Sequence, residues 1–136
     1  MATTSTILVA DDDSGIRTVV TQALVRSGYD VIPVGDGTSL MDKVRSGEGD
    51  LLVTDVILPD GNGLDMIPEI QALRPDMKII VMSAQTTLMT AVKATELGAY
   101  EYLPKPFDIN ELTRNIKAAL DTTPGDEGTF GMVALD

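Results

Sequence analysis

The sequence predicts an α/β fold in which five strands alternate with five helices, (βα)5, and the helices cover both faces of a parallel sheet. Two observations lead to this prediction. Five short runs rich in Val and Ile alternate with stretches in which apolar residues recur every three or four positions. The short runs are apolar at consecutive positions, as expected for parallel strands that are buried on both faces. The length of 136 residues fits a single domain with one core.

The five predicted strands are short and are separated by turn-forming residues. They cover residues 7–10, 31–34, 51–54, 79–82 and 100–103, of which the last is the weakest. The apolar positions of the five predicted helices are Ile16, Val19, Val20, Ala23 and Leu24; Leu40 and Val44; Leu64, Ile67, Ile70 and Leu73; Leu88, Ala91 and Val92; and Ile109, Leu112, Ile116 and Leu120.

Signals at the ends of these helices support the assignment. Gly28 and Gly98 stand where helices are expected to end, and Asp108 followed by Glu111 resembles a capping box at a helix start. Pro68 is the one local objection. It is tolerated if the third helix begins near Leu64 or Asp65, because amides of the first turn have no partner within the helix.

Composition restricts the chemistry. The chain has no Cys and no His, so disulfides, thiol nucleophiles, zinc sites and histidine bases are excluded. Its net charge of −11 opposes direct binding to nucleic acids or to anionic membranes. No apolar run approaches the ~20 residues that a membrane span needs. With no secretory signal in residues 1–6, the expected location is the cytoplasm.

The domain is expected to cover residues 1–120. After Leu120 the composition changes to Thr, Pro, Gly and acidic residues, which is typical of a linker or flexible tail over residues 121–136.

Polar side chains follow four of the predicted strands, and the carboxyl ends of parallel strands are where open α/β sheets bind ligands. Asp11, Asp12 and Asp13 follow the first strand, and Asp55 follows the third. Ser83 follows the fourth strand and Lys105 the fifth.

Three carboxylates close together are stable only if they are protonated or neutralised by a cation. Asp11, Asp12 and Asp55 are therefore candidate ligands for Mg²⁺, with Mn²⁺ as a substitute. In the alternative interpretation the acids at 11–13 only cap the first helix, as Asp13 or Ser14 can do.

Asp55 can also act as a nucleophile. A carboxylate can attack a phosphoryl group in line while a metal ion neutralises charge on the transferred oxygens. The Ser83 hydroxyl and the Lys105 ammonium could bind the same phosphoryl group, although each alone is more often an ordinary turn or loop residue.

Together these residues resemble the receiver domains of bacterial two-component response regulators. The matching elements are Asp11-Asp12, Asp55-x-x-x-Pro59-x-x-x-Gly63, Ser83-Ala84 and Lys105-Pro106-Phe107, within about residues 6–120. Residues 9–14 and 98–108 are most similar to the NtrC class of nitrogen-regulation activators.

The resemblance implies a flavodoxin-like sheet in the order 2-1-3-4-5 and a sensor histidine kinase that phosphorylates Asp55. It implies that Asp12, Asp55 and the Ile57 carbonyl bind Mg²⁺, with Asp11 acting through water, and that Ser83 and Lys105 contact the phosphate. Ser83 and Tyr102 would switch the surface formed by the fourth helix, fifth strand and fifth helix. The Lys105–Pro106 bond is often cis in such domains.

The resemblance also implies limits. NtrC-type proteins contain an ATPase and a DNA-binding domain, but this sequence has no Walker A loop and no basic helix-turn-helix. The expected function is therefore a phosphoaccepting receiver that regulates nitrogen-related transcription when joined to an effector, with a phosphorylation-dependent homodimer as one outcome. It is not expected to be an enzyme beyond catalysing its own phosphorylation and dephosphorylation.

Four alternatives stay open. The chain could be a stand-alone receiver or a protein-binding module without an output domain. A phosphohydrolase of the haloacid dehalogenase type would need a second Asp where Ile57 stands. A flavin binder would need a phosphate loop after the first strand, where Asp11-Asp12-Asp13 would repel a phosphate.

Overall fold

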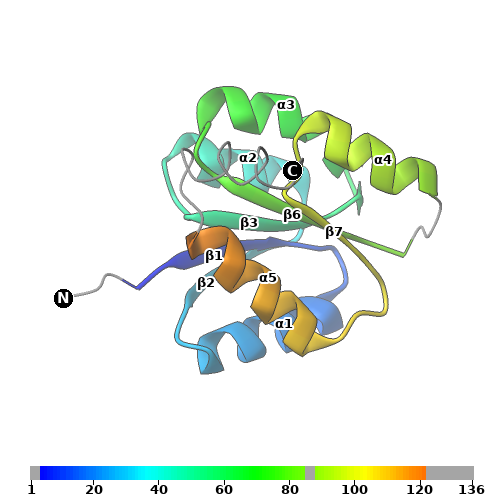
Figure 1. Ribbon diagram of the computed structural model, residues 1–136. Helices are drawn as coiled ribbons and strands as arrows, with labels where there is room; N and C mark the ends of the chain where they lie inside the picture. Colours follow the sequence, from blue (N-terminus) through cyan, green and yellow to red (C-terminus); the bar gives the residue numbers. More distant parts are fainter. Residues whose placement is uncertain (1–3, 85–87, 122–136) are drawn as a thin grey trace, which may run out of the picture.

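The computed structural model describes residues 4–84 and 88–121 (Figure 1). Its elements in chain order are β1 (Thr6–Ala10), α1 (Ser14–Arg26), β2 (Asp30–Val34), α2 (Gly37–Arg45), β3 (Leu51–Asp55), β4 (Ile57–Leu58), β5 (Gly61–Asn62), α3 (Gly63–Leu73), β6 (Lys78–Ser83), α4 (Leu88–Leu97), β7 (Glu101–Pro104) and α5 (Ile109–Asp121).

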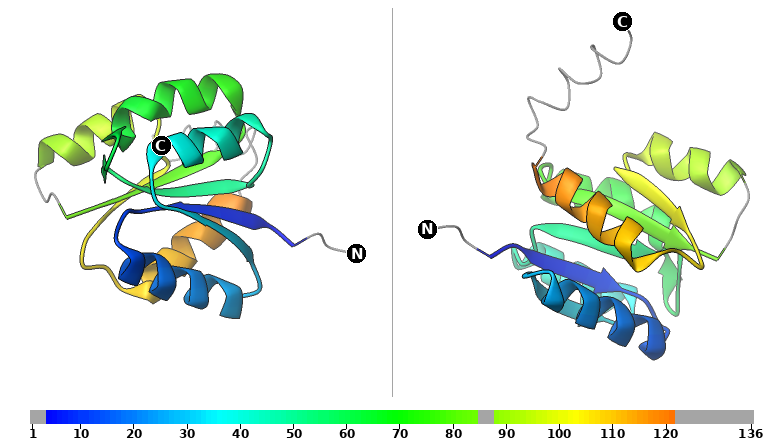
Figure 2. Two further views of the ribbon diagram at one scale, coloured as in Figure 1. Left: turned by 180° about the vertical axis from the view of Figure 1, so that it is seen from behind. Right: turned by 60° about the horizontal axis from the view of Figure 1, so that its bottom comes forward.

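The main sheet has five parallel strands in the order β2-β1-β3-β6-β7, which confirms the predicted fold and strand order. It lies between two helical layers (Figures 1 and 2). β3 is central and buried at every position, whereas β2 is an edge strand that accommodates Pro33.

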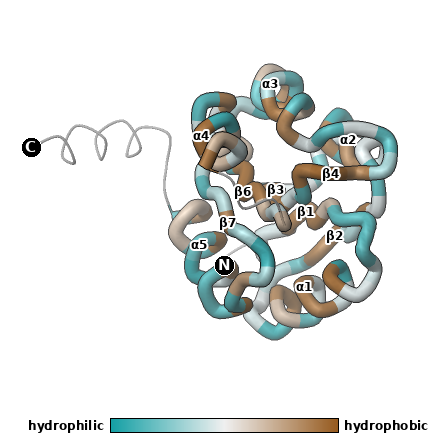
Figure 3. The backbone as a smooth tube through the Cα atoms, turned by 90° about the vertical axis from the view of Figure 1, so that its right-hand side faces the viewer, coloured by the Kyte–Doolittle hydropathy of each residue, from teal (hydrophilic) through white to brown (hydrophobic). Residues whose placement is uncertain are grey.

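Successive residues of each strand point to opposite faces, so each face has its own apolar core. Most of the strands in the middle of the molecule are coloured as hydrophobic in Figure 3. On one face, Leu8 and Leu52 pack with buried side chains of α2, α3 and α4. On the other, Ile7 and Val53 pack with buried side chains of α1 and α5. Burial on both faces explains why the strands are apolar at consecutive positions.

Most of the predicted helix ends are confirmed. Gly28 and Gly98 follow α1 and α4 with φ of 96° and 110°, a left-handed conformation that glycine adopts without steric cost. At the start of α5 the Asp108 carboxylate accepts from the Asn110 amide at 2.8 Å, and the Glu111 amide donates to the Asp108 backbone carbonyl at 2.9 Å, so the expected capping box is replaced by this simpler arrangement.

The third helix begins one or two residues before the expected start near Leu64 or Asp65, but Pro68 does not lie in its first turn as expected. α3 begins at Gly63 and Asn62 is its N-cap, so Pro68 lies in the second turn. There it removes the hydrogen bond that an amide at this position would donate to the Leu64 carbonyl. Burial of Leu64, Ile67 and Ile70 in the core holds the helix in spite of this loss.

The segment between β3 and α3, where the sequence predicts no strand, contains a small antiparallel hairpin. Ile57 pairs with Asn62 and Leu58 with Gly61, which leaves Pro59 and Asp60 as the two turn residues. This hairpin connects the end of the central strand to the start of α3.

Gly63, at the end of this hairpin, permits a close backbone approach. A Cβ atom at this position would collide with the carbonyl oxygen of Asp55. We therefore expect Gly63→Ala to lower the free energy of unfolding by about 1–3 kcal/mol, measured by urea denaturation.

Gly61→Ala is a matched control for Gly63→Ala, because its Cβ would meet only the Met66 side chain, at an ordinary 3.5 Å. It should change the free energy of unfolding by no more than about 0.5 kcal/mol. Equal effects of the two substitutions would contradict the steric explanation.

The described residues contain no helix that is both long and apolar enough to span a membrane. Of the predicted tail over 121–136, the structure describes only Asp121, the last residue of α5.

Candidate functional site

Four predicted site residues meet at the carboxyl ends of the strands. Asp11 follows β1, Asp55 ends β3, Ser83 ends β6 and Lys105 follows β7. Asp11, Asp55 and Ser83 are buried, and Asp12 is exposed. Since these strands are neighbours in the sheet, residues from four distant parts of the chain share one site.

Three carboxylates lie close enough to share one cation. One oxygen each of Asp11, Asp12 and Asp55 fall within 4.8 Å of one another. An all-oxygen donor set with one exposed member fits a hard divalent cation that keeps part of its water shell. The acidic cluster is thus suited to bind a divalent metal ion.

Asp13 has a different role from its two neighbours. Its carboxylate accepts hydrogen bonds from the amides of Gly15 at 2.8 Å and Ile16 at 3.1 Å, which makes it the N-cap of α1. The capping interpretation of the acidic triplet is therefore correct for Asp13 alone, because the Asp11 and Asp12 carboxylates belong to the cluster with Asp55.

Lys105 bridges two of the clustered carboxylates. Its Nζ lies 2.7 Å from Asp11 Oδ2 and 3.0 Å from Asp55 Oδ2. The side chains of Lys105, Asp11 and Asp55 are only 14%, 0% and 11% exposed, so water screens these contacts weakly. The ammonium neutralises part of the negative charge that the strand ends bring together.

Burial sets the direction of the pKa shifts. It raises the pKa of Asp55, with the charge of Asp11 adding to the shift and Lys105 opposing it. Burial opposes the charged form of Lys105, but the hydrogen bonds to Asp11 and Asp55 outweigh it and raise the pKa of Lys105. Lys105 is therefore a cation, and Asp55 is less stable as a free carboxylate than an exposed Asp.

Backbone hydrogen bonds fix the strand ends relative to one another. The Lys105 amide donates to the Ser83 carbonyl at 2.6 Å, and the Val56 amide donates to the Met82 carbonyl at 3.2 Å. The Arg17 guanidinium donates to the Asp11 carbonyl at 2.7 Å. The Lys105–Pro106 peptide bond, whose isomer the sequence left open, is cis.

The two predicted switch residues lie on adjacent strands. Ser83 is paired in register with Pro104, at the end of β6. Tyr102 is half-buried on β7 and packs against the core beneath α2, α3 and α4. Their positions on the last two strands fit the predicted roles, which stay predictions.

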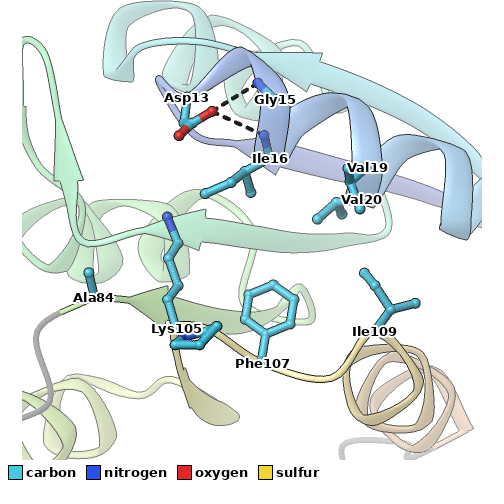
Figure 4. A pocket seen from close by; sticks show the side chains of 10 residues that line it. Asp13, Gly15, Ile16, Val19, Val20, Ala84, Lys105, Phe107 and Ile109 are labelled. Carbon is cyan, nitrogen blue, oxygen red and sulfur yellow. Dashed lines mark hydrogen bonds between the residues drawn. The ribbon is translucent and has the colours of Figure 1, made fainter.

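An apolar hollow of about 590 Å³ adjoins the charged cluster between α1 and the segment that leads into α5 (Figure 4). Ile16, Val20, Phe107 and Ile109 are among the residues that line it. Lys105 also lines it, so this residue belongs both to the charged cluster and to the hollow.

Asp60 is a polar residue that the sequence interpretation missed. Its carboxylate accepts hydrogen bonds from the amide of Gly37 at 2.7 Å, and from the amide and hydroxyl of Thr38 at 2.9 and 2.7 Å. The signal was present, since Pro-Asp-Gly after a strand is typical of a tight turn. The contact of Asp60 with α2, which lies more than twenty residues away in sequence, cannot be read from this local pattern.

These contacts predict a pH-dependent contribution to stability. The hydrogen bonds from the Thr38 hydroxyl and from the Gly37 and Thr38 amides lower the pKa of Asp60 from 3.8 to about 2. A carboxyl group with a lowered pKa stabilises the fold in full above its unfolded-state value, and the contribution is lost as the pH falls through the folded-state value. The stability difference between the parent and Asp60→Asn should therefore shrink between about pH 4 and pH 2, measured as melting temperature. A constant difference over this range would contradict the assigned contacts.

Comparisons with known proteins identify the family of the chain. Residues 7–117 match the family model of the response regulator receiver domain. The DNA-binding transcriptional regulator NtrC of Azospirillum brasilense is 56% identical over 130 residues, which cover 91% of this chain and 27% of that protein. The chain spans about a quarter of the length of the curated NtrC relatives that it matches.

Solved structures show the same fold. The beryllofluoride-activated NtrC4 receiver domain dimer is similar with a TM-score of 0.82 and 33% identity, over 85% of this chain and 96% of that one. A Burkholderia pseudomallei response regulator with a phosphorylated aspartic acid, calcium ion and citrate has a TM-score of 0.76 and 27% identity, over 96% of this chain and 74% of that one. The chain therefore belongs to the response regulator receiver domain family of two-component systems and is close to NtrC receiver domains.

Proposed function

We propose that Asp55 is the phosphoacceptor of this receiver domain and that Mg²⁺, or Mn²⁺ in its place, assists the transfer. The proposal rests on one observation: Asp55 lies beside Asp11, Asp12 and Lys105 at the carboxyl ends of the strands. The similar Burkholderia pseudomallei structure with a phosphorylated aspartic acid supports it.

The chain's own groups account for the transfer. A carboxylate oxygen of Asp55 attacks the phosphorus and forms an O–P bond, while the bond from phosphorus to the donor breaks and its electron pair leaves with the donor. The Lys105 ammonium, 3.0 Å from Asp55 Oδ2, can contact a phosphoryl oxygen with little movement. Its charge offsets the negative charge that the phosphoryl group adds to the site.

A bound Mg²⁺ would neutralise charge on the transferred oxygens and orient them for in-line attack. Asp12, Asp55 and the Ile57 carbonyl would hold it, with Asp11 acting through water. The exposure of Asp12 supports this arrangement, because Mg²⁺ keeps several of its waters and also binds substrate phosphate.

A sensor histidine kinase is the proposed donor, and the effector ATPase and DNA-binding domains of NtrC-type regulators are the proposed output partners. The curated relatives, which extend well beyond this chain, are DNA-binding transcriptional regulators and support an output role in transcription. That the regulated genes are nitrogen-related is part of the proposal and rests on the resemblance to the NtrC class. The net charge of −11 supports the absence of direct nucleic-acid or membrane binding by the chain itself. Family membership supports a cytoplasmic location for the chain. It also supports the proposal that the chain catalyses only its own phosphorylation and dephosphorylation.

For the switch, we propose that Ser83 and Tyr102 couple the phosphoryl group to the surface of α4, β7 and α5. Leu88 and Met89 at the start of α4 are 77% and 75% exposed, which leaves an apolar surface available for a partner. The similar receiver structure that is a dimer supports a phosphorylation-dependent homodimer.

Intact mass spectrometry tests the proposal. The chain is incubated with acetyl phosphate, with and without Mg²⁺, and the adduct is located by peptide mass after trapping with hydroxylamine. One phosphoryl group on Asp55 that forms only with Mg²⁺ is the expected result. A chain that binds Mg²⁺ but forms no adduct would overturn the proposal and favour the protein-binding module.

A further inference from the structure

The hairpin between β3 and α3 lies next to the proposed metal and phosphoryl site. Asp55 precedes it directly, and it includes Ile57, whose amide donates to Asp55 Oδ1 at 3.4 Å. With four paired residues, such a hairpin is marginal on its own. Its position must therefore be fixed by contacts with the rest of the molecule.

The base of the hairpin is fixed to the main sheet. The Val56 amide donates to the Met82 carbonyl at 3.2 Å, and the Gly63 amide donates to the Val56 carbonyl at 2.6 Å. These bonds hold residues 56 and 63, and the buried Leu58 side chain packs in the core, whereas Pro59 and Asp60 at the far end are exposed.

The far end is fixed to α2 through the Asp60 carboxylate. One of its oxygens accepts from the Gly37 amide, and the other accepts from the amide and hydroxyl of Thr38. Asp36 already caps α2 by accepting from the Ser39 amide at 2.7 Å. The helix therefore has its own cap, and Asp60 adds a connection between α2 and the hairpin.

We propose that Asp60 is a positioning residue for the metal and phosphoryl site: by joining the tip of the hairpin to α2, it fixes the segment 56–62 that bears the Ile57 carbonyl. This inference rests on the proposed function, since it requires that the Ile57 carbonyl, which Asp60 helps to position, binds Mg²⁺. Groups that orient metal ligands typically affect affinity about 10–100-fold when removed.

Three variants separate this role from simple capping of α2. Asp60→Ala removes the connection, and Asp60→Asn keeps one acceptor oxygen and should give an intermediate result. Asp36→Ala is the matched control, because it removes the N-cap bond to Ser39 at the same helix end and leaves the Asp60 contacts in place.

Two measurements apply to the three variants and the parent chain. Amide hydrogen exchange of Leu58 and Gly61, the pair that flanks the turn, in the absence of metal, reports the order of the hairpin. The Mg²⁺ concentration at half-saturation, from calorimetric titration without a phosphodonor, reports the metal site. In Asp60→Ala we expect faster exchange and about tenfold weaker Mg²⁺ binding, whereas Asp36→Ala should match the parent in both.

Parent-like Mg²⁺ affinity in Asp60→Ala would overturn the inference, and so would equal weakening in Asp36→Ala, which would reduce Asp60 to a second cap. A parent chain that binds no Mg²⁺ would overturn it as well. Absence of a phosphoryl adduct from a parent that does bind Mg²⁺ would overturn the proposed function alone, because neither measurement depends on phosphorylation.

Discussion

Asp55→Asn is expected to form no phosphoryl adduct from acetyl phosphate and Mg²⁺ under conditions in which the parent chain is phosphorylated. The amide has the shape of the carboxylate but only one oxygen, so it can accept from either the Ile57 amide or the Lys105 ammonium, which bond different oxygens of Asp55. It lacks the negative charge that makes the carboxylate a nucleophile. Intact mass over time measures the loss.

Unfolding cannot explain this loss if the variant is at least as stable as the parent without metal. Burial and the charge of Asp11 disfavour the Asp55 carboxylate, so removing its charge relieves repulsion. We therefore expect the melting temperature of metal-free Asp55→Asn to equal or exceed that of the parent. Asp13→Asn is the control for the same substitution at an Asp outside the cluster, because Asn caps α1 as well as Asp does. Phosphorylation of Asp55→Asn at the parent rate would place the phosphoryl group on another residue.

Lys105→Met is expected to lower the free energy of unfolding by about 3 kcal/mol in the absence of metal, because it leaves two buried carboxylates without their cation. Asp11 and Asp55 would then face each other with no ammonium between them. Mg²⁺ should recover much of the loss, since an ion that binds only the folded chain stabilises it by about 2.7 kcal/mol at one hundred times its dissociation constant. Urea denaturation with and without Mg²⁺ measures both effects.

Lys117→Met is the matched control for Lys105→Met. Lys117 pairs with Asp121 at 3.2 Å on the surface of α5, where the two side chains are 73% and 66% exposed. Such a pair contributes little, so we expect a change below about 0.5 kcal/mol and no dependence on Mg²⁺. Similar effects of the two lysine substitutions would show that the contacts between Lys105 and the carboxylates do not stabilise the fold.

The fold and most of the site could be predicted from the sequence because both depend on simple periodic patterns. Consecutive apolar residues located the five parallel strands, and the residues that follow such strands are brought to one edge of the sheet. Asp11, Asp12, Asp55, Ser83 and Lys105 were found in this way. Their roles in transfer and switching are chemical events that a pattern of residues does not reveal, and these stay predictions.

The errors lie where tertiary contacts determine the local structure. Pro68 appeared to require a later helix start, but burial of α3 against the sheet outweighs one missing hydrogen bond. The hairpin after Asp55 has too few residues to show an alternating pattern. The role of Asp60 depends on Gly37 and Thr38, which are far from it in sequence and meet it only in the folded chain.

The edge position of β7 has a consequence for the order in which the protein assembles during synthesis. β7 pairs only with β6, so a nascent chain that ends before residue 101 contains four of the five parallel strands. Such a chain contains the strands that lead to Asp11 and Asp55 but lacks Lys105, which follows the last strand. Until this strand docks, only solvent cations or protons can balance the two acids. Addition of the final strand thus completes the sheet and brings in the ammonium that offsets part of the negative charge of the site in the same step.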